Sequence, residues 1–325
     1  MKLSVFDRLS YDEFLSNFEN RLCGDQRASA IFPGALPYTP CTALDLSCSG
    51  LLEKVPPPFP PSFARHLTSL TLNEFPFTSI GSRLVFPHLK RLSFAVAPLN
   101  SQCQIEKIFL NACPNLETFS LELKHEVKFK SEYVDLLSSF PSLTSFAFIG
   151  VSPASDSKLL NRFLEWIGKS KLEVLSFDVE EVFVNSWASK QCSLSPLPST
   201  LSSFSLKIDG HLPSAFVELF SSYLLKPPSP PTPFHPPPPS SLRHLKLCFF
   251  DFRSPFPINI FAKYSSLRSL VIKRMDHHLP LESYEFIDTN DLWALIRSLP
   301  FLERVKFGNL SLRMCGSLLF IYIFA

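Results

Sequence analysis

Six residues with cationic or potentially cationic side chains recur at corresponding positions of a repeated apolar motif in the second half of the 325-residue chain. They are Lys207, His244, Lys246, Lys273, Arg304 and Lys306. Cationic groups gathered on one surface form charge-assisted hydrogen bonds with carboxylates and phosphates. This pattern predicts a basic strip that binds an acidic peptide, a phosphorylated segment or a small polyanion. The alternative interpretation is that these side chains only keep an exposed sheet soluble.

The sequence lacks the motifs that usually support catalysis or hold a cofactor. It contains no Gly-x-Gly-x-x-Gly pattern, no phosphate-loop lysine pattern and no Gly-x-Ser-x-Gly elbow. The neighbouring His277 and His278 would point in different directions on regular structure, and neither has a cysteine partner at zinc spacing. We therefore expect a protein that is not an enzyme and that carries no cofactor and no metal.

Charge and cysteine usage limit the classes of partner and compartment. The net charge of +2 is too small for a surface-wide nucleic-acid footprint, so electrostatic recognition must be local. The eight cysteines include no Cys-x-x-Cys pair and are expected to be reduced thiols. Charged residues from Asp7 to Glu13 interrupt any signal-peptide core. An intracellular location, cytoplasmic or nuclear, is expected.

The basic strip depends on a repeated motif of leucine, two residues, an apolar residue, one residue and a second apolar residue, which occurs nine times. Successive copies begin 22 to 41 residues apart, and most of these spacings fall in the range of about 20–29 that is typical of leucine-rich repeats. The anchors are Leu67/Leu70/Leu72, Leu89/Leu92/Phe94, Leu116/Phe119/Leu121, Leu143/Phe146/Phe148, Leu172/Leu175/Phe177, Leu201/Phe204/Leu206, Leu242/Leu245/Leu247, Leu267/Leu270/Ile272 and Leu302/Val305/Phe307.

The periodicity within and between the motifs predicts the elements that position the strip. Apolar and polar residues alternate in each motif, which predicts a short strand with one buried face. Helical periodicity follows in residues 105–113, 133–140, 159–167, 216–225 and 292–299. Stacked strand-helix units cover each other's apolar faces, so we expect a curved parallel sheet inside and helices outside. The 33 phenylalanines are interpreted as core filling.

The strand residues between the apolar anchors are expected to line the concave face of such a sheet. In the first six repeats these positions are mostly small or hydroxylated, and the acidic residues Glu122 and Asp178 lie among them. The six cationic residues occur in the last four repeats. The sequence therefore predicts a small, serine-rich floor that carries Glu122 and Asp178, followed by the basic strip.

Segments such as CPNLETFSL (113–121) and FPSLTSFAF (140–148) resemble the irregular repeats of the intracellular F-box leucine-rich-repeat group. The resemblance covers about residues 40–310 and implies an α/β solenoid of about 9–10 irregular repeats. It also implies a protein-protein interaction scaffold. Two roles stay open, the substrate-recognition subunit of a cullin-type ubiquitin ligase and a stand-alone adaptor or regulator with no ligase link.

Three regions are expected along the chain. Residues 1–40 contain an amphipathic segment, 6–22, with Ser10 and Glu13 spaced as a capping box, which predicts a helical end cap. The same segment resembles the start of an F-box through Leu9, Glu13, Phe14, Leu15 and Phe18, and that resemblance implies docking of a ligase adaptor. Residues 41–312 form the solenoid, with a proline-rich insertion at 226–239 that must loop out. Residues 313–325 form an apolar cap or tail, too short to span a bilayer.

Overall fold

The computed structural model divides the chain into two compact units, Met1–Leu143 and Thr144–Ala325. It describes residues 2–5, 43–47, 64–73, 85–96, 109–124, 127–150, 157–180, 197–211, 241–251, 258–274, 289–307, 310–315 and 318–323. The expected helices at 6–22 and 216–225 and the proline-rich insertion at 226–239 lie outside these residues.

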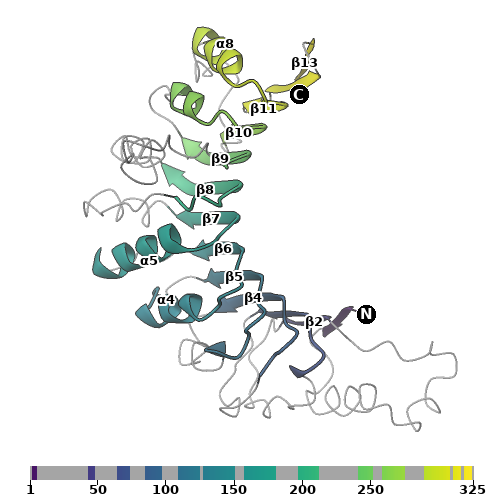
Figure 1. Ribbon diagram of the computed structural model, residues 1–325, viewed down its shortest axis with the longest axis vertical. Coiled ribbons are helices and arrows are strands. Elements are labelled where there is room, and N and C mark those ends of the chain that lie inside the picture. Colours follow the sequence, from purple (N-terminus) through teal and green to yellow (C-terminus); the bar gives the residue numbers. More distant parts are fainter. Residues whose placement is uncertain are drawn as a thin grey trace, which may run out of the picture. The chain divides into compact units, whose positions relative to one another are not determined.

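The amino-terminal unit contains parallel strands that are hydrogen-bonded in chain order (Figure 1). They are β1 (Lys2–Val5), β2 (Ala43–Ser47), β3 (Ser69–Asn73), β4 (Arg91–Val96) and β5 (Thr118–Leu123). Helix α4 (Ser131–Ser138) follows β5. Chain-order pairing of parallel strands requires each connection to cross back over the sheet in the same sense.

The carboxyl-terminal unit continues this plan with more strands. Its parallel strands are β6 (Ser145–Gly150), β7 (Val174–Glu180), β8 (Ser203–His211), β9 (His244–Asp251), β10 (Ser269–Arg274) and β11 (Arg304–Phe307). Its helices are α5 (Ser157–Lys169), the 3₁₀ helix η3 (Ile258–Lys263) and α8 (Thr289–Ser298). The antiparallel strands β12 (Leu310–Cys315) and β13 (Leu318–Ile323) follow β11.

The parallel α/β architecture expected from the motifs is confirmed, whereas two details of the expectation are not. Three of the predicted helices, at 133–140, 159–167 and 292–299, correspond to α4, α5 and α8. The sheet is not curled, contrary to the predicted curvature. Before β10 the described residues form the 3₁₀ helix η3 and not an α-helix, so the expected unit of one strand and one α-helix is not kept there.

Alternation along each strand separates an apolar face from a polar one. In β7, Leu175, Phe177 and Val179 are at most 3% exposed, while the intervening side chains are more exposed. In the carboxyl-terminal unit, α5, η3 and α8 lie on one side of the strands (Figure 1). The apolar strand residues pack against that side, as the contact between Phe146 of β6 and Phe163 of α5 shows. The opposite face of the same strands has no helix drawn over it.

A hydrogen-bonded turn precedes six of the strands and recurs with the motif. The amide of the first anchor leucine donates to the carbonyl three residues earlier at Leu89, Leu116, Leu143, Leu201, Leu267 and Leu302. Just after the turn, one carbonyl accepts two successive amides of the next repeat, as Thr68 accepts those of Lys90 and Arg91. The carbonyl of Glu173 likewise accepts the amides of Ser202 and Ser203. This ladder satisfies the backbone at the strand entrances and fixes the register between repeats.

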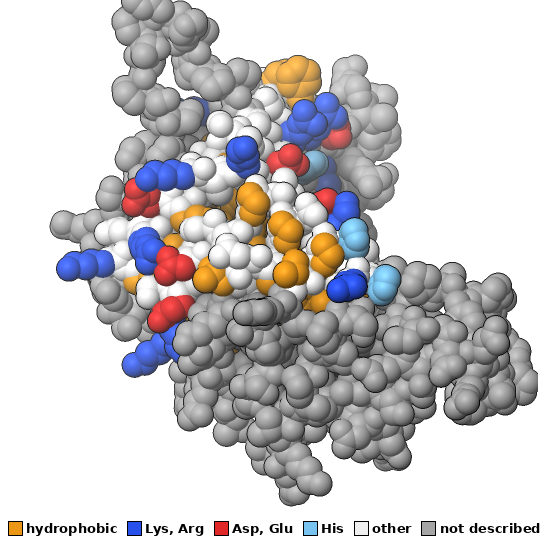
Figure 2. All heavy atoms as spheres, turned by 60° about the horizontal axis from the view of Figure 1, so that its bottom comes forward, with side chains coloured by type: hydrophobic (Ala, Val, Ile, Leu, Met, Phe, Trp, Pro, Cys, Tyr) orange, Lys and Arg blue, Asp and Glu red, His pale blue; other side chains and the backbone are white. Residues whose placement is uncertain are grey.

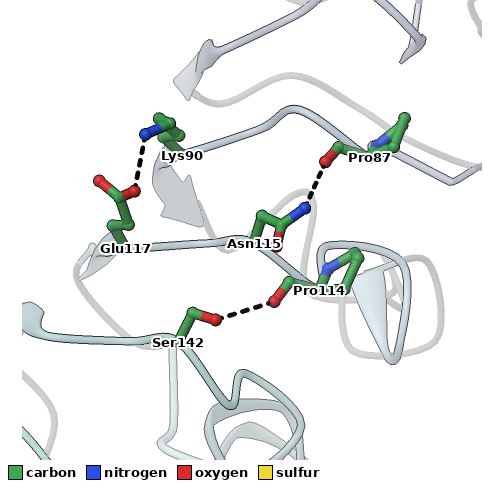
Figure 3. A network of polar contacts seen from close by, with 6 residues as sticks. All are labelled: Pro87, Lys90, Pro114, Asn115, Glu117 and Ser142. Carbon is green, nitrogen blue, oxygen red and sulfur yellow. Dashed lines mark hydrogen bonds and ion pairs between the residues drawn. The ribbon is translucent and has the colours of Figure 1, made fainter.

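Side chains of the turns add a second ladder in the amino-terminal unit (Figure 3). The Asn115 side-chain amide donates to the Pro87 carbonyl at 2.8 Å. The Ser142 hydroxyl donates to the Pro114 carbonyl at 3.2 Å. Each donor immediately follows a proline in its own turn, Pro114 before Asn115 and Pro141 before Ser142. Each of these two turns is therefore tied to the turn before it. The carboxyl-terminal unit has an equivalent bond from Thr200 to the Leu172 carbonyl at 2.8 Å.

Replacing Gly150 by alanine is expected to destabilise the protein by about 1–3 kcal/mol. A Cβ atom at Gly150 would lie 2.8 Å from Cζ of Phe148. That ring is fully buried and contacts Phe163 and Phe177, so it has little room to move. Chemical denaturation of both proteins measures the difference. Ile149→Ala, at an exposed neighbouring position, is the matched control, and an equal loss in both variants would contradict the packing argument.

Candidate functional site

The candidate site is the sheet face of the carboxyl-terminal unit that points away from α5, η3 and α8, which we call the polar sheet face. Strand register arranges its residues in three rows that run across the strands. The first row is Ser145, Val174, Ser203, His244, Ser269 and Arg304. The second is Ala147, Ser176, Ser205, Lys246, Val271 and Lys306. The third is Ile149, Asp178, Lys207, Cys248 and Lys273. Beyond the third row, Glu180 of β7 and Asp209 of β8 are register partners on the same face.

The structure brings all six sequence-predicted residues onto this face. Each row contains two of them, placed two strands apart with one uncharged residue between them. Ser269 separates His244 from Arg304, Val271 separates Lys246 from Lys306, and Cys248 separates Lys207 from Lys273. Their grouping follows from the anchor alignment, because equivalent motif positions in adjacent parallel strands are register partners.

Lys207 differs from the other members of the predicted strip because it is already paired. Its ammonium group lies 2.7 and 2.9 Å from the two carboxylate oxygens of Asp178 on the neighbouring strand. Both side chains are about a third exposed, so the pair is partly shielded from water. The sequence interpretation counted Lys207 with the strip and Asp178 with the floor. Asp178 and Lys207 occupy the same motif position in consecutive repeats. Their opposite charges at this shared position were the sequence signal for the ion pair.

The side chains of four residues of the strip make no hydrogen bond or ion pair within the part of the chain that the structure describes. These are His244, Lys246, Lys273 and Arg304. Three of them are exposed, and Lys273 is half-buried. Lys306 is half-buried and engaged in another interaction within the chain. The side chains of His244, Lys246, Lys273 and Arg304 are therefore available at the surface of β9, β10 and β11.

Between the charges, the polar sheet face is built from small side chains. Ser176, Ser205 and Ser269 are half-buried, so the middle of the face is low and uncharged. Ile149 and Val174 add apolar area near β6 and β7, with 37% and 38% of each side chain exposed. Figure 2 draws one face of the whole molecule, on which hydrophobic and other uncharged side chains lie in the middle and charged side chains of both signs lie around them. A face of this kind offers contact area as well as charge.

Cys248 lies among the lysines of the third row but is not an activated nucleophile. Its side chain is 4% exposed. Burial raises the pKa of the Cys248 thiol, while Lys246, Lys273 and Lys207 lower it less than burial raises it. The protonated thiol is the weaker nucleophile, and reactive cysteines have lowered pKa values and exposed sulfur atoms. The cysteine therefore contributes packing beneath the lysines and no thiolate chemistry.

Metal and membrane chemistry was also tested against the structure. No group of three or more His, Cys, Asp and Glu side chains suited to a metal ion is found in the described residues. His277 and His278 lie outside them. None of the described helices combines the length and the apolar character needed to cross a membrane.

Stability above pH 9 is expected to fall because of Cys113, a buried thiol of the amino-terminal unit. Burial raises the pKa of Cys113 from 9.0 to about 12. Between those pH values the unfolded thiol ionises and the folded one does not, so the unfolded state gains stability as pH rises. The free energy of unfolding should fall by about 1.4 kcal/mol per pH unit from this group alone.

Denaturation at pH 8 and at pH 11 measures this loss in the native protein and in Cys113→Ala. The loss should be about 2–3 kcal/mol smaller in the variant. Burial also raises the pKa of Tyr264, but both proteins carry that residue and its effect cancels. Equal losses in the two proteins would show that the Cys113 thiol ionises as readily in the folded chain as in the unfolded one.

Comparison of the sequence with known proteins finds no matching family model and no significant match among curated proteins. Function is therefore inferred from the polar sheet face and the residues on it.

Proposed function

We propose that this chain is a protein-binding scaffold, built as a leucine-rich-repeat solenoid, which holds its partner on the polar sheet face. The solenoid is supported by parallel strands in chain order and by a turn that recurs before strand after strand. In such arrays each unit contacts mainly its neighbours, and the open sheet face is extended and rigid. An extended rigid face suits the binding of another macromolecule better than the enclosure of a small molecule.

One observation carries the proposal. The parallel strands of the carboxyl-terminal unit bury one face against helices and leave the other with small side chains, exposed apolar area and four cationic or potentially cationic groups without partners in the described residues. Surface cations that only confer solubility are ordinarily scattered or paired with acidic neighbours. Here they occupy one face at regular positions, while elsewhere Lys90 pairs with Glu117 and Arg268 with Glu303.

The ligase-receptor role predicted from the resemblance is one version of this function. In that version, residues 6–22 dock a cullin-ligase adaptor and the polar sheet face holds the substrate. The alternative is a stand-alone adaptor that uses the same face. These versions differ in the amino-terminal segment, which lies outside the described residues. They make the same prediction for the sheet face.

Site-specific photo-crosslinking in the native cell tests the proposal. A photoreactive amino acid is placed at Ser205, in the middle of the polar sheet face, and in a matched variant at Glu165 on the exposed side of α5. We expect one protein to crosslink from position 205 and not from 165, and to bind the purified chain in solution. Crosslinking that is equal at the two positions, or absent from position 205, would contradict the proposal.

The same preparation separates the two versions of the function. A cullin-ligase adaptor recovered with the native chain, and lost when Phe14 and Phe18 are both changed to aspartate, would assign the ligase-receptor role. Retention of the crosslinked partner without any such adaptor would assign the stand-alone role.

A further inference from the structure

We propose that the polar sheet face contains a phosphate-binding site between Lys246 of β9 and Lys273 of β10, and that the partner protein places a phosphorylated side chain there. This inference rests on the proposed function and names the chemistry of the partner at one point of the face. It follows from the arrangement of four neighbouring side chains, from the charges around them and from the charge of a phosphate monoester.

Four residues of two adjacent strands form the proposed site. In the register of β9 and β10, Lys246 is the partner of Val271, and Cys248 is the partner of Lys273. The two lysines therefore occupy opposite corners of this group. Their Cα atoms are about 8 Å apart, from spacings of about 4.8 Å between strands and about 6.6 Å between alternate residues. Lysine carries its ammonium group on a flexible four-carbon stem, so both groups can reach one anion between them.

The other two corners form a low, uncharged floor between the lysines. Cys248 is 4% exposed and Val271 is half-buried, so both side chains leave room above them. Burial raises the pKa of the Cys248 thiol, and Lys246 and Lys273 are the two charges that lower it most. Both ammonium groups therefore lie near the sulfur atom, where an anion placed over the floor would meet them.

The charges of these two lysines are not neutralised by a neighbour. Neither side chain makes a hydrogen bond or an ion pair within the described residues. The polar sheet face does carry carboxylates, but they belong to β7 and β8. Asp178 is held in its ion pair with Lys207, and Glu180 and Asp209 lie beyond the third row. The site on β9 and β10 therefore offers two positive charges to a ligand.

A phosphate monoester matches two unpaired lysines in both charge and geometry. At neutral pH it carries a charge of about −1.5 to −2 and has three oxygen atoms that accept hydrogen bonds. A carboxylate carries a single negative charge, and so does each phosphate diester of a nucleic acid. Charge-assisted hydrogen bonds from both ammonium groups to one group are therefore best satisfied by a phosphorylated side chain.

Titration of the full chain with short peptides tests the inference. The probe is a blocked peptide with a central phosphoserine between glycines, and its two counterparts carry glutamate or serine at the centre. Nuclear magnetic resonance follows the peptide signals as protein is added and gives the dissociation constants. We expect the phosphopeptide to bind at least about tenfold more tightly than the glutamate peptide. Equal affinities of these two peptides would overturn the inference.

Variants of the full chain locate the site. Lys246→Gln combined with Lys273→Gln should weaken binding of the phosphopeptide at least about tenfold. Arg304→Gln combined with Lys263→Gln is the matched control, because it removes the same charge from β11 and η3 and leaves the two lysines in place. The control should bind the phosphopeptide within about twofold of the native chain. Equal losses in the two double variants would assign binding to overall charge and overturn the site.

The partner identified by photo-crosslinking supplies a test that needs no variant. Position 205 is the register partner of Lys246, so a segment bound at the site lies within reach of the photoreactive group. We expect dephosphorylation of the purified partner to weaken its binding to the chain at least about tenfold. A partner that crosslinks from position 205 and binds equally well after complete dephosphorylation would overturn this inference and leave the proposed function standing.

Other phosphate-bearing molecules supply the last comparison. An oligonucleotide or a vesicle of phosphatidylserine should bind the chain more weakly than the phosphorylated partner does, because its phosphate groups are diesters. Tighter binding of either one, with the same loss in the Lys246→Gln and Lys273→Gln double variant, would overturn the assignment of the site to a phosphorylated protein.

Discussion

Replacing Phe163 by alanine should lower the free energy of unfolding by about 3–5 kcal/mol, the largest expected effect of any single truncation in α5. The Phe163 ring is 1% exposed and stands at the centre of an aromatic cluster. Its centroid lies between 6.0 and 6.2 Å from those of Phe146, Phe148, Trp166 and Phe177. Removing the ring leaves a cavity lined by side chains of β6, β7 and α5. The close-packed neighbours cannot move far enough to fill it.

Equilibrium denaturation in urea measures the change. Trp293→Ala on α8 removes a larger ring that is 42% exposed, and it should cost about 1 kcal/mol or less. The contrast between the two variants isolates burial from ring size. Similar losses would mean that the aromatic cluster is not a principal source of stability. The cluster is relevant to function because it fixes β6 and β7, which carry the uncharged part of the polar sheet face.

Aspartate at Leu245 should prevent folding of the carboxyl-terminal unit, whereas aspartate at the adjacent Lys246 should change stability by less than about 1 kcal/mol. Leu245 is 1% exposed, and its register partners are Phe204 and Leu270. A carboxylate there would be buried without a partner, which costs several kcal/mol even after the surroundings relax. Lys246 is exposed on the opposite face, where aspartate stays hydrated.

Circular dichroism and size-exclusion chromatography of the two variants give the measurement. The Leu245→Asp protein should lose the cooperative transition or accumulate as aggregate, and the Lys246→Asp protein should unfold as the native protein does. Two adjacent substitutions with such different outcomes test the face assignment of β9 directly. Comparable stability of the two would place Leu245 outside the core and remove the basis for the polar sheet face.

In the proposed function, the two faces would keep recognition and stability apart in this chain. Stability comes from leucine and phenylalanine positions on the helical side, such as Leu247 and Phe249 of β9. Recognition is assigned to the alternate positions on the same strand, His244 and Lys246. Because side chains alternate in a strand, charge on one face can change without altering the packing of the other. Partner preference can therefore vary on a constant framework.

Much of the fold was predictable because its signals are local. The alternation within each motif predicted strands from β3 to β11, and the helical periodicity predicted α4, α5 and α8. The grouping of the six cationic residues was predictable for the same reason, since equivalent motif positions become register partners when parallel strands stack in order. The cap or F-box-like segment, the insertion and the role of residues 313–325 remain predictions.

The sequence by itself determined the strands β3 to β11 and the face that each of their residues occupies, because a period of two depends only on neighbours along the chain. Tertiary structure decided the uncurled sheet, the burial that raises the pKa of the Cys248 thiol and the pairing of Lys207 with Asp178. Each of these depends on distances between atoms that are remote in sequence, 29 residues apart for the ion pair. The register and packing of neighbouring strands decide which charged side chains meet and which side chains are buried. The periodic pattern of a single strand does not specify either.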